Sequence, residues 1–190
     1  MKNAHVEAEL NIKNAAGNRG NNMIIRGDEI ISFLEGKTKD YKGRTFQDLL
    51  DFTDIEMEKC HDQIQWTFPL HEESDHANTY PIVDKEIIEK ARLSKTIQFN
   101  LTRALERLVK FYGLGEYEDP NIQRKWCRDH NHNLLRVTRI IRCMRLFGLD
   151  AHARFFYNEA VRVGSRLGIS QITLDYWDKA MHDDVWKSLK

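Results

Sequence analysis

The chain has 190 residues, a formal net charge of zero and 41% hydrophobic residues, which is typical of one soluble globular domain and too apolar for a disordered segment. No apolar run approaches the roughly 20 residues that span a bilayer, and the first residues lack the apolar core of a signal peptide. Cys60, Cys127 and Cys143 have no regular spacing, which argues against a secreted disulfide framework. We therefore expect a cytoplasmic or nuclear protein with no transmembrane segment and no signal peptide.

The first 22 residues end in NAAGNRGNN and show no periodicity, which predicts a flexible N-terminal arm. Helix signals then follow one another over residues 23–190, and strand candidates are few and short. We expect this region to form a single all-α domain, an irregular or orthogonal bundle of about seven or eight helices.

Helix starts are marked by capping signals in the first half of the chain. Thr45 with Asp48 and Thr53 with Glu56 have the spacing of capping boxes. The second box predicts one helix through DIEMEKCHDQIQWTF, which Pro69 must break. The polar stretch HEESDHANTYP that follows predicts a loop.

The most regular helical pattern starts after the cap Ser94 and stops at Gly113. Its apolar face at i, i+4 and i+7 spacing consists of Ile97, Leu101, Ala104, Leu105, Leu108, Phe111 and Tyr112.

A second helix is predicted from about His132 to Phe147. One side of its helical wheel carries Val137, Ile140, Ile141, Met144 and Phe147, and the other carries Arg136, Arg139, Arg142 and Arg145. The arginine side also contains two leucines, which is typical of a central helix in a bundle. Because an unpaired buried charge is costly, some of these guanidinium groups need carboxylate or carbonyl partners from elsewhere in the fold.

The start of this helix, CRDHNHN, contains a possible metal-ligand cluster of Cys127, His130 and His132. A structural zinc site needs a fourth ligand, and none lies nearby in the sequence. We therefore predict no metal site, and expect that Asn131 or Asp129 caps the helix through a side-chain oxygen.

The stretch HDQIQWTFPL, residues 61–70, combines polar and aromatic residues at a predicted helix end. On a helix, His61, Gln65 and Phe68 share a face, and Trp66 points toward a different neighbour. These side chains form either a ligand pocket or a polar network that braces a buried helix end.

Charge is unevenly distributed along the chain. Acidic residues prevail between Asp28 and Lys90, and arginines prevail between Arg124 and Arg166. The two halves either neutralise each other in the fold or leave arginines free for a phosphate-bearing partner. The residues available for nucleic-acid association in the second case are Arg124, Lys125, Arg128, Arg142, Arg145, Arg154 and Arg162.

An enzyme is a third possibility, for example a hydrolase that uses His61 or His132 as a base beside Asp62 or Asp129. No glycine-bounded serine, phosphate loop or H-E-x-x-H motif supports it. We therefore predict no catalytic residues and no cofactor.

Three blocks of the sequence resemble the conserved region of the opioid growth factor receptor family: HDQIQWTFPL, KFYGLGEYED and HNLLRVTRIIRCMRLFGLDAHARFF. The resemblance extends from about residue 28 to about residue 165. The chain departs from the family pattern at Gln63, where an aromatic residue is usual, and at Thr67, where an apolar residue is usual. The matching positions are His61, Asp62, Ile64, Gln65, Trp66, Phe68, Pro69, Asn133, Leu135, Arg136, Thr138 and Arg139.

The resemblance implies the fold of that family, and a receptor rather than an enzyme. Vertebrate members are described as nucleus-associated receptors for a pentapeptide enkephalin, unrelated to the seven-helix opioid receptors. No catalytic residue set and no cofactor is implied.

The motif residues and the family resemblance together favour a non-catalytic binding domain for a peptide, an anionic small molecule or a protein partner. We expect its site where the end of the first motif helix meets the start of the second. There Arg136 or Arg139 offers an anchor for an anion and Trp66 offers a flat apolar wall. The candidate site residues are His61, Asp62, Gln65, Trp66, His132, Asn133, Arg136 and Arg139.

Overall fold

A computed structural model of the chain describes residues 23–74, 79–187 and 189. Within these residues the predicted all-α fold is confirmed. They form ten α-helices and one short 3-10 helix, and the only strands among them are two of three residues each. The predicted N-terminal arm, residues 1–22, lies outside the described residues. None of the described helices is both long enough and apolar enough to cross a membrane.

The elements follow one another along the chain with short connections. In order they are β1 (Met23–Ile25), α2 (Asp28–Leu34), α3 (Phe46–Leu50), α4 (Asp54–Lys59), α5 (Gln63–Thr67), β2 (Thr79–Pro81), α6 (Lys85–Leu93), α7 (Lys95–Phe111), η1 (Gly115–Tyr117), α8 (Pro120–Trp126), α9 (His132–Leu146), α10 (Asp150–Leu167) and α11 (Gln171–His182).

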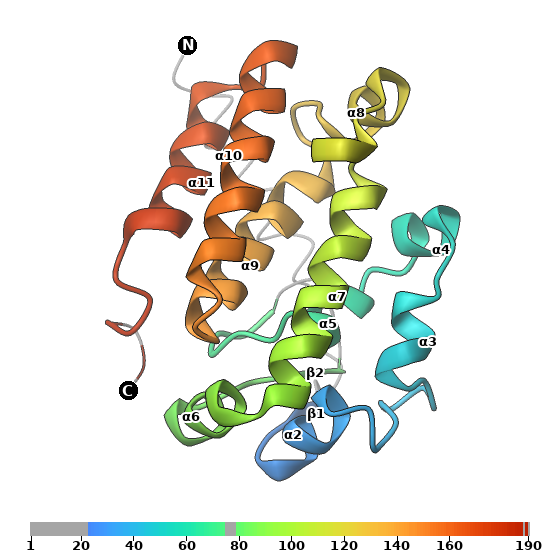
Figure 1. Cartoon of the computed structure of the whole chain (residues 1–190), viewed down its shortest axis with the longest axis vertical. Helices are drawn as coiled ribbons and strands as arrows, with labels where there is room; N and C mark the ends of the chain where they lie inside the picture. The colour runs from blue at the N-terminus through green and yellow to red at the C-terminus, as the bar shows by residue number, and fades with distance from the viewer. Residues whose placement is uncertain (1–22, 75–78, 188, 190) are drawn as a thin grey trace.

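Helix α7 lies in the middle of the molecule, with α2 and α6 at one of its ends and α3 beside it (Figure 1). Ser94 caps it, since its side-chain oxygen accepts a hydrogen bond from the Ile97 amide. Every residue of the predicted apolar face is buried, so local periodicity alone gave its orientation correctly.

Helix α9 packs against both α10 and α11, which also contact each other (Figure 1). Gly164 makes part of this packing possible, because a Cβ at that position would lie 3.0 Å from the ring of Trp177 on α11. The five apolar residues predicted for one side of α9 are all fully buried. As predicted, Asn131 caps the helix, since its side chain accepts a hydrogen bond from the Asn133 amide at 2.8 Å.

The helix predicted across residues 54–68 is instead two helices, α4 and α5, and this prediction was wrong. Both capping boxes are present, but α4 ends at Lys59, and the next residue, Cys60, has an extended backbone with a ψ of 98°. The chain breaks there because side chains from the loop between α2 and α3 bind Asp62, which immediately precedes α5. This additional helix is one reason why the bundle has more than the seven or eight helices expected.

The two strands pair in parallel, with Ile24 opposite Tyr80. One further bridge joins Leu70 to Ile82, and the Val83 amide donates to the Leu70 carbonyl at 3.1 Å. Strands of three residues are too short to show alternation in the sequence. Together with the Leu70–Ile82 bridge, the pairing places β2 beside α5.

Candidate functional site

The two motif blocks meet in the structure. Arg136 on α9 donates through Nη1 to the Met57 carbonyl at 2.9 Å and through Nη2 to the Cys60 carbonyl at 3.3 Å. One turn later, Arg139 Nη1 donates to the Phe68 carbonyl at 3.0 Å. Of the carboxylate or carbonyl partners expected for the α9 arginines, these two arginines have carbonyls, which attach α9 to the ends of α4 and α5.

A cavity of about 340 Å³ lies between α9 and the segment from residue 61 to residue 74. Five of the eight candidate residues line it, namely His61, Gln65, His132, Arg136 and Arg139, whereas Asp62, Trp66 and Asn133 do not. The other lining residues are Ile64, Leu70, Glu72, Glu73, Ser74, Leu135, Thr138 and Arg142.

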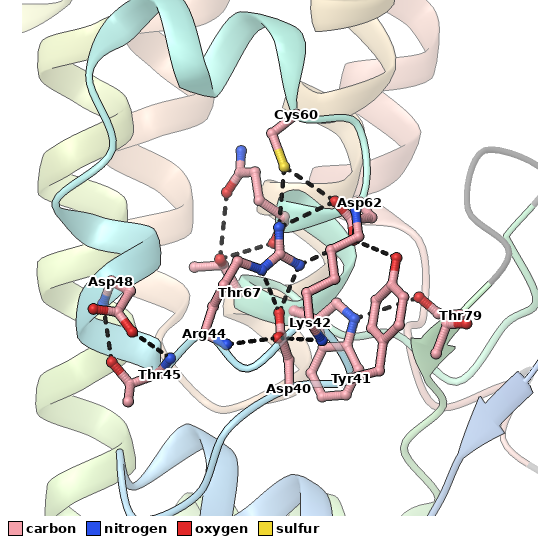
Figure 2. A network of polar contacts seen from close by, with 12 residues as sticks. Asp40, Tyr41, Lys42, Arg44, Thr45, Asp48, Cys60, Asp62, Thr67 and Thr79 are labelled. Atoms are coloured by element: carbon pink, nitrogen blue, oxygen red, sulfur yellow. Dashed lines mark hydrogen bonds and ion pairs between the residues drawn. The ribbon is translucent and has the colours of Figure 1, made fainter.

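Asp62 belongs to a separate polar cluster, which we call the Arg44 clamp: Asp40, Tyr41, Lys42, Arg44, Cys60 and Asp62 (Figure 2). Arg44 Nη2 lies 2.9 Å from Asp62 and 2.5 Å from Asp40, so one guanidinium group joins two buried carboxylates. The clamp ties the loop between α2 and α3 to the residues just before α5.

The Asp62 carboxylate accepts further hydrogen bonds, from the Tyr41 hydroxyl at 2.7 Å and the Cys60 thiol at 3.0 Å, and Lys42 lies 2.9 Å away. Burial tends to raise the pKa of Asp62, but the hydrogen bonds from Arg44 and these neighbours outweigh it and hold the pKa well below its usual range. The carboxylate is thus ionised and fully engaged in structural contacts.

Trp66 is buried on the side of α5 away from the cavity. Its ring stacks on Tyr41 with centroids 6.1 Å apart and meets the edge of Phe33 at 4.9 Å. The indole Nε1 donates to the Thr79 carbonyl at 3.3 Å. The expected apolar wall of the cavity is therefore supplied by Ile64 and leucines instead of Trp66.

Gln65 lines the cavity and braces the start of α5. In the amide orientation that satisfies both ends, Nε2 donates to the His61 carbonyl at 2.7 Å and the Asp62 carbonyl at 3.1 Å, and Oε1 accepts from the Ser74 hydroxyl. This arrangement matches the polar network that the sequence offered as an alternative to a pocket.

Asn133 lies in the first turn of α9 and is fully buried. Its Oδ1 accepts from the Tyr112 hydroxyl at 3.3 Å and from Arg136 Nη1 at 3.2 Å, and its Nδ2 donates to Glu58 at 3.0 Å. It therefore joins α4, α7 and α9 and is not exposed to the cavity.

The two candidate histidines contact each other at one edge of the cavity. The rings of His61 and His132 lie edge to face with centroids 5.1 Å apart, and His132 Nε2 lies 3.5 Å from Glu58. The acid partners that a hydrolase would need are engaged elsewhere: Asp62 in the Arg44 clamp, and Asp129 with the Ser170 amide at 3.1 Å.

Arg139 has an unusual electrostatic environment at the cavity. It is partly buried, its one hydrogen bond goes to a carbonyl, and it forms no ion pair with any described residue. Glu72 instead binds Arg142 through both oxygens, one of them at 2.8 Å. Burial lowers the pKa of Arg139 to about 10, as expected for a cation whose lost hydration is not fully replaced.

The residues proposed for nucleic-acid association divide into two groups. Arg142 and Arg145 are structural, because Arg142 pairs with Glu72 and Arg145 donates to the Ala180 carbonyl at 2.9 Å. Arg162 pairs with Glu159 and Glu118. Exposed residues that form no ion pair within the described part of the chain are Arg124, Lys125, Arg128 and Arg154.

Cys127, His130 and His132 do not converge. Across residues 23–74 and 79–187, no group of three histidine, cysteine or acidic side chains is placed to hold a metal ion.

Sequence reasoning missed two features. Arg142 was assigned to a nucleic-acid surface, although it lies three residues after Arg139, and that spacing places both on one helical face. The Arg44 clamp was missed because Asp40 and Arg44 lie in a loop without any motif, and nothing local indicates their distant partner Asp62.

The sequence of the chain is similar to those of known proteins. A family model described as the opioid growth factor receptor (OGFr) conserved region matches residues 45–187. The chain belongs to this family. The matched span starts and ends later than the span expected from the motif blocks, and it includes α3 to α11.

Curated relatives in this family are longer proteins. The opioid growth factor receptor of mouse is 33% identical over 64% of this chain and 21% of its own length, and the human protein is 32% identical over 64% and 20%. The mouse opioid growth factor receptor-like protein 1 is 26% identical over 67% of this chain and 30% of its own length. The chain thus spans about a fifth to a third of these relatives. No solved structure matches it.

Proposed function

We propose that this chain is a non-catalytic binding domain and that the cavity beside α9 takes the carboxylate or phosphate group of a peptide, a small molecule or a protein partner. The observation that carries the proposal is the Arg139 guanidinium, a partly buried cation at the cavity with a carbonyl as its hydrogen-bond partner. Glu72 acts on Arg139 at a distance but pairs directly with Arg142, so an anion would supply the direct ion pair that Arg139 does not form with a described residue, and charge-assisted hydrogen bonds to guanidinium are strong.

The size and the other lining residues of the cavity suit a small ligand or the end of a peptide chain. The volume of about 340 Å³ is near the lower end for ligand pockets, which fits one side chain or chain end. Ile64, Leu70 and Leu135 supply apolar contact next to the charge. The name receptor, carried by the relatives, supports binding rather than catalysis. A cytoplasmic or nuclear location is part of the proposal.

Calorimetric titration with matched probes tests the proposal. Acetyl-leucine and inorganic phosphate should bind, and acetyl-leucine amide, which lacks the carboxylate, should not. Arg139→Gln should weaken binding of both anions by about tenfold or more, the scale of one charge-assisted contact.

Arg154→Gln is the control, since it removes an exposed arginine on α10 that forms no ion pair with described residues. It should leave the affinity unchanged. Equal binding of acid and amide, unchanged affinity in Arg139→Gln, or no binding of either anion would contradict the anion site.

Nucleic-acid association is the second candidate, and the exposed cluster at the end of α8 favours it. Arg124, Lys125 and Arg128 lie within five residues and have no acidic partner in the described part of the chain. Binding to a nucleic acid through them should weaken steeply as salt rises. Absence of binding at low salt, or an affinity that does not change with salt, would remove this candidate.

A further inference from the structure

A second cavity, of about 590 Å³, lies between α7, η1 and α10 and takes no part in the function proposed above. Gly115 shapes it: its φ is +58°, and a Cβ at this position would lie 3.3 Å from the Phe155 ring. The Phe155 ring therefore lies close over the backbone of η1. The lining residues are Thr102, Leu105, Glu106, Val109, Gly115, Glu116, Tyr117, His152 and Phe155.

Two aromatic side chains in this lining are accessible to a ligand. Tyr117 is 42% exposed and Phe155 is 48% exposed, although both are large and apolar. Single exposed aromatic residues are common and need no explanation. Two that line one cavity are a more specific feature, because the face of an aromatic ring has a negative electrostatic potential that attracts a cation.

The charges in the lining are all acidic. Glu106 and Glu116 are exposed, neither forms an ion pair with a described residue, and no lysine or arginine lines the cavity. The hydrogen bond from Tyr117 to Glu116, together with the negative charges of Glu116 and Glu106, raises the pKa of Tyr117. The hydroxyl group of Tyr117 is thus close to the carboxylate of Glu116.

We propose that this cavity binds an organic cation, specifically a quaternary ammonium group. Such a group is weakly hydrated, has an apolar surface that matches Tyr117 and Phe155, and carries the charge that Glu106 and Glu116 attract. The same chemistry occurs in a free choline-like molecule and in the trimethylated side chain of a lysine.

A pair of isosteric probes separates the charge from the shape. Choline should bind to the full chain, as measured by calorimetry or by shifts of NMR signals from η1 and α10. Its neutral isostere, 3,3-dimethylbutanol, should bind at least about fivefold more weakly than choline. Acetyl-trimethyllysine amide forms the second arm: tighter binding than choline assigns the site to a modified protein, and weaker binding assigns it to a small molecule.

Variants then locate the binding. Phe155→Leu keeps an apolar side chain but removes the π face, and the double variant Glu106→Gln with Glu116→Gln removes the charges. Each should weaken choline binding by about fivefold, whereas the control Glu29→Gln, at an exposed position on α2, should not. No binding of choline at about 10 mM, equal binding of the neutral isostere, or native affinity in Phe155→Leu would overturn the proposal.

Discussion

Arg44 and Arg139 both contact the first motif block, but they differ in their direct partners. Arg44 joins two carboxylates, Asp40 and Asp62, and hydrogen-bonds to both (Figure 2). Arg139 has a carbonyl partner and a lowered pKa. Both contact the same short segment, residues 60–68, so the difference between them lies in the partners that the fold provides.

This comparison separates structural polar residues from residues available to a ligand. Removal of one partner from a buried, fully paired cluster leaves an uncompensated charge, which is strongly destabilising. Removal of a cation that forms no ion pair leaves no carboxylate without its counter-charge, so the loss of stability should be smaller. Motif residues are therefore better classified by their partners than by their position in the motif.

The largest effect is expected from Arg44→Met. It leaves the carboxylates of Asp40 and Asp62 buried without their shared counter-charge, and should lower the free energy of unfolding by about 3–5 kcal/mol. Urea unfolding followed by circular dichroism measures this, with Arg154→Met as the exposed control. A loss below about 1 kcal/mol would show that the clamp is dispensable.

The clamp also predicts a pH dependence. The pKa of Asp62 is lower in the folded state than the value of about 3.9 in an unfolded chain. Its contribution to stability is therefore fully present above about pH 4 and is lost as the pH falls through the folded-state pKa. Between about pH 5 and pH 2, the unfolding free energy of Asp62→Asn should fall less steeply than that of the native chain. Parallel curves would contradict this assignment.

Two buried glutamines differ in the same way, since one is fully hydrogen-bonded and the other is not, and smaller effects are expected from them. Gln65 is hydrogen-bonded at both ends of its amide, whereas Gln63 Nε2 is buried with no partner among the described residues. Gln65→Met should cost about 1–3 kcal/mol, and Gln63→Met should stabilise the chain by about 1 kcal/mol. Melting temperatures of the two variants test the pair, and a shift in the same direction for both would contradict the argument.

The smallest effect on stability is expected from Arg139→Met. The variant loses one hydrogen bond to the Phe68 carbonyl but no ion pair with a described residue, and the cost of burying the cation disappears. We expect a change in unfolding free energy within about 1 kcal/mol. A loss similar to that of Arg44→Met would mean that Arg139 is a structural residue too.

Local patterns predicted much of the fold. Spacing within one segment predicts the apolar faces of α7 and α9 and the capping boxes at Thr45 and Thr53. It also predicts that the α9 arginines need carboxylate or carbonyl partners. The break before α5 could not be predicted in this way. It depends on Arg44, which lies 18 residues before Asp62 in the sequence.

The position of the cavity was predictable, because both motif blocks contain polar residues in apolar surroundings. Which of these residues face the cavity was not. A continuous helix through residues 54–68 would orient the side chains differently from the short helix α5, whose Trp66 packs against Tyr41 and Phe33 instead. Glu72 and Arg142 are brought together only by tertiary packing.

The most direct test measures unfolding free energy against the concentration of inorganic phosphate at constant ionic strength. The native chain and Arg44→Met should both gain stability as phosphate occupies the cavity, by RT ln(1 + [L]/Kd), although Arg44→Met starts from a lower value. Arg139→Met should start near the native value and gain nothing. An equal gain in Arg139→Met, or no gain in the native chain, would contradict the view that Arg139 is the arginine available to a ligand.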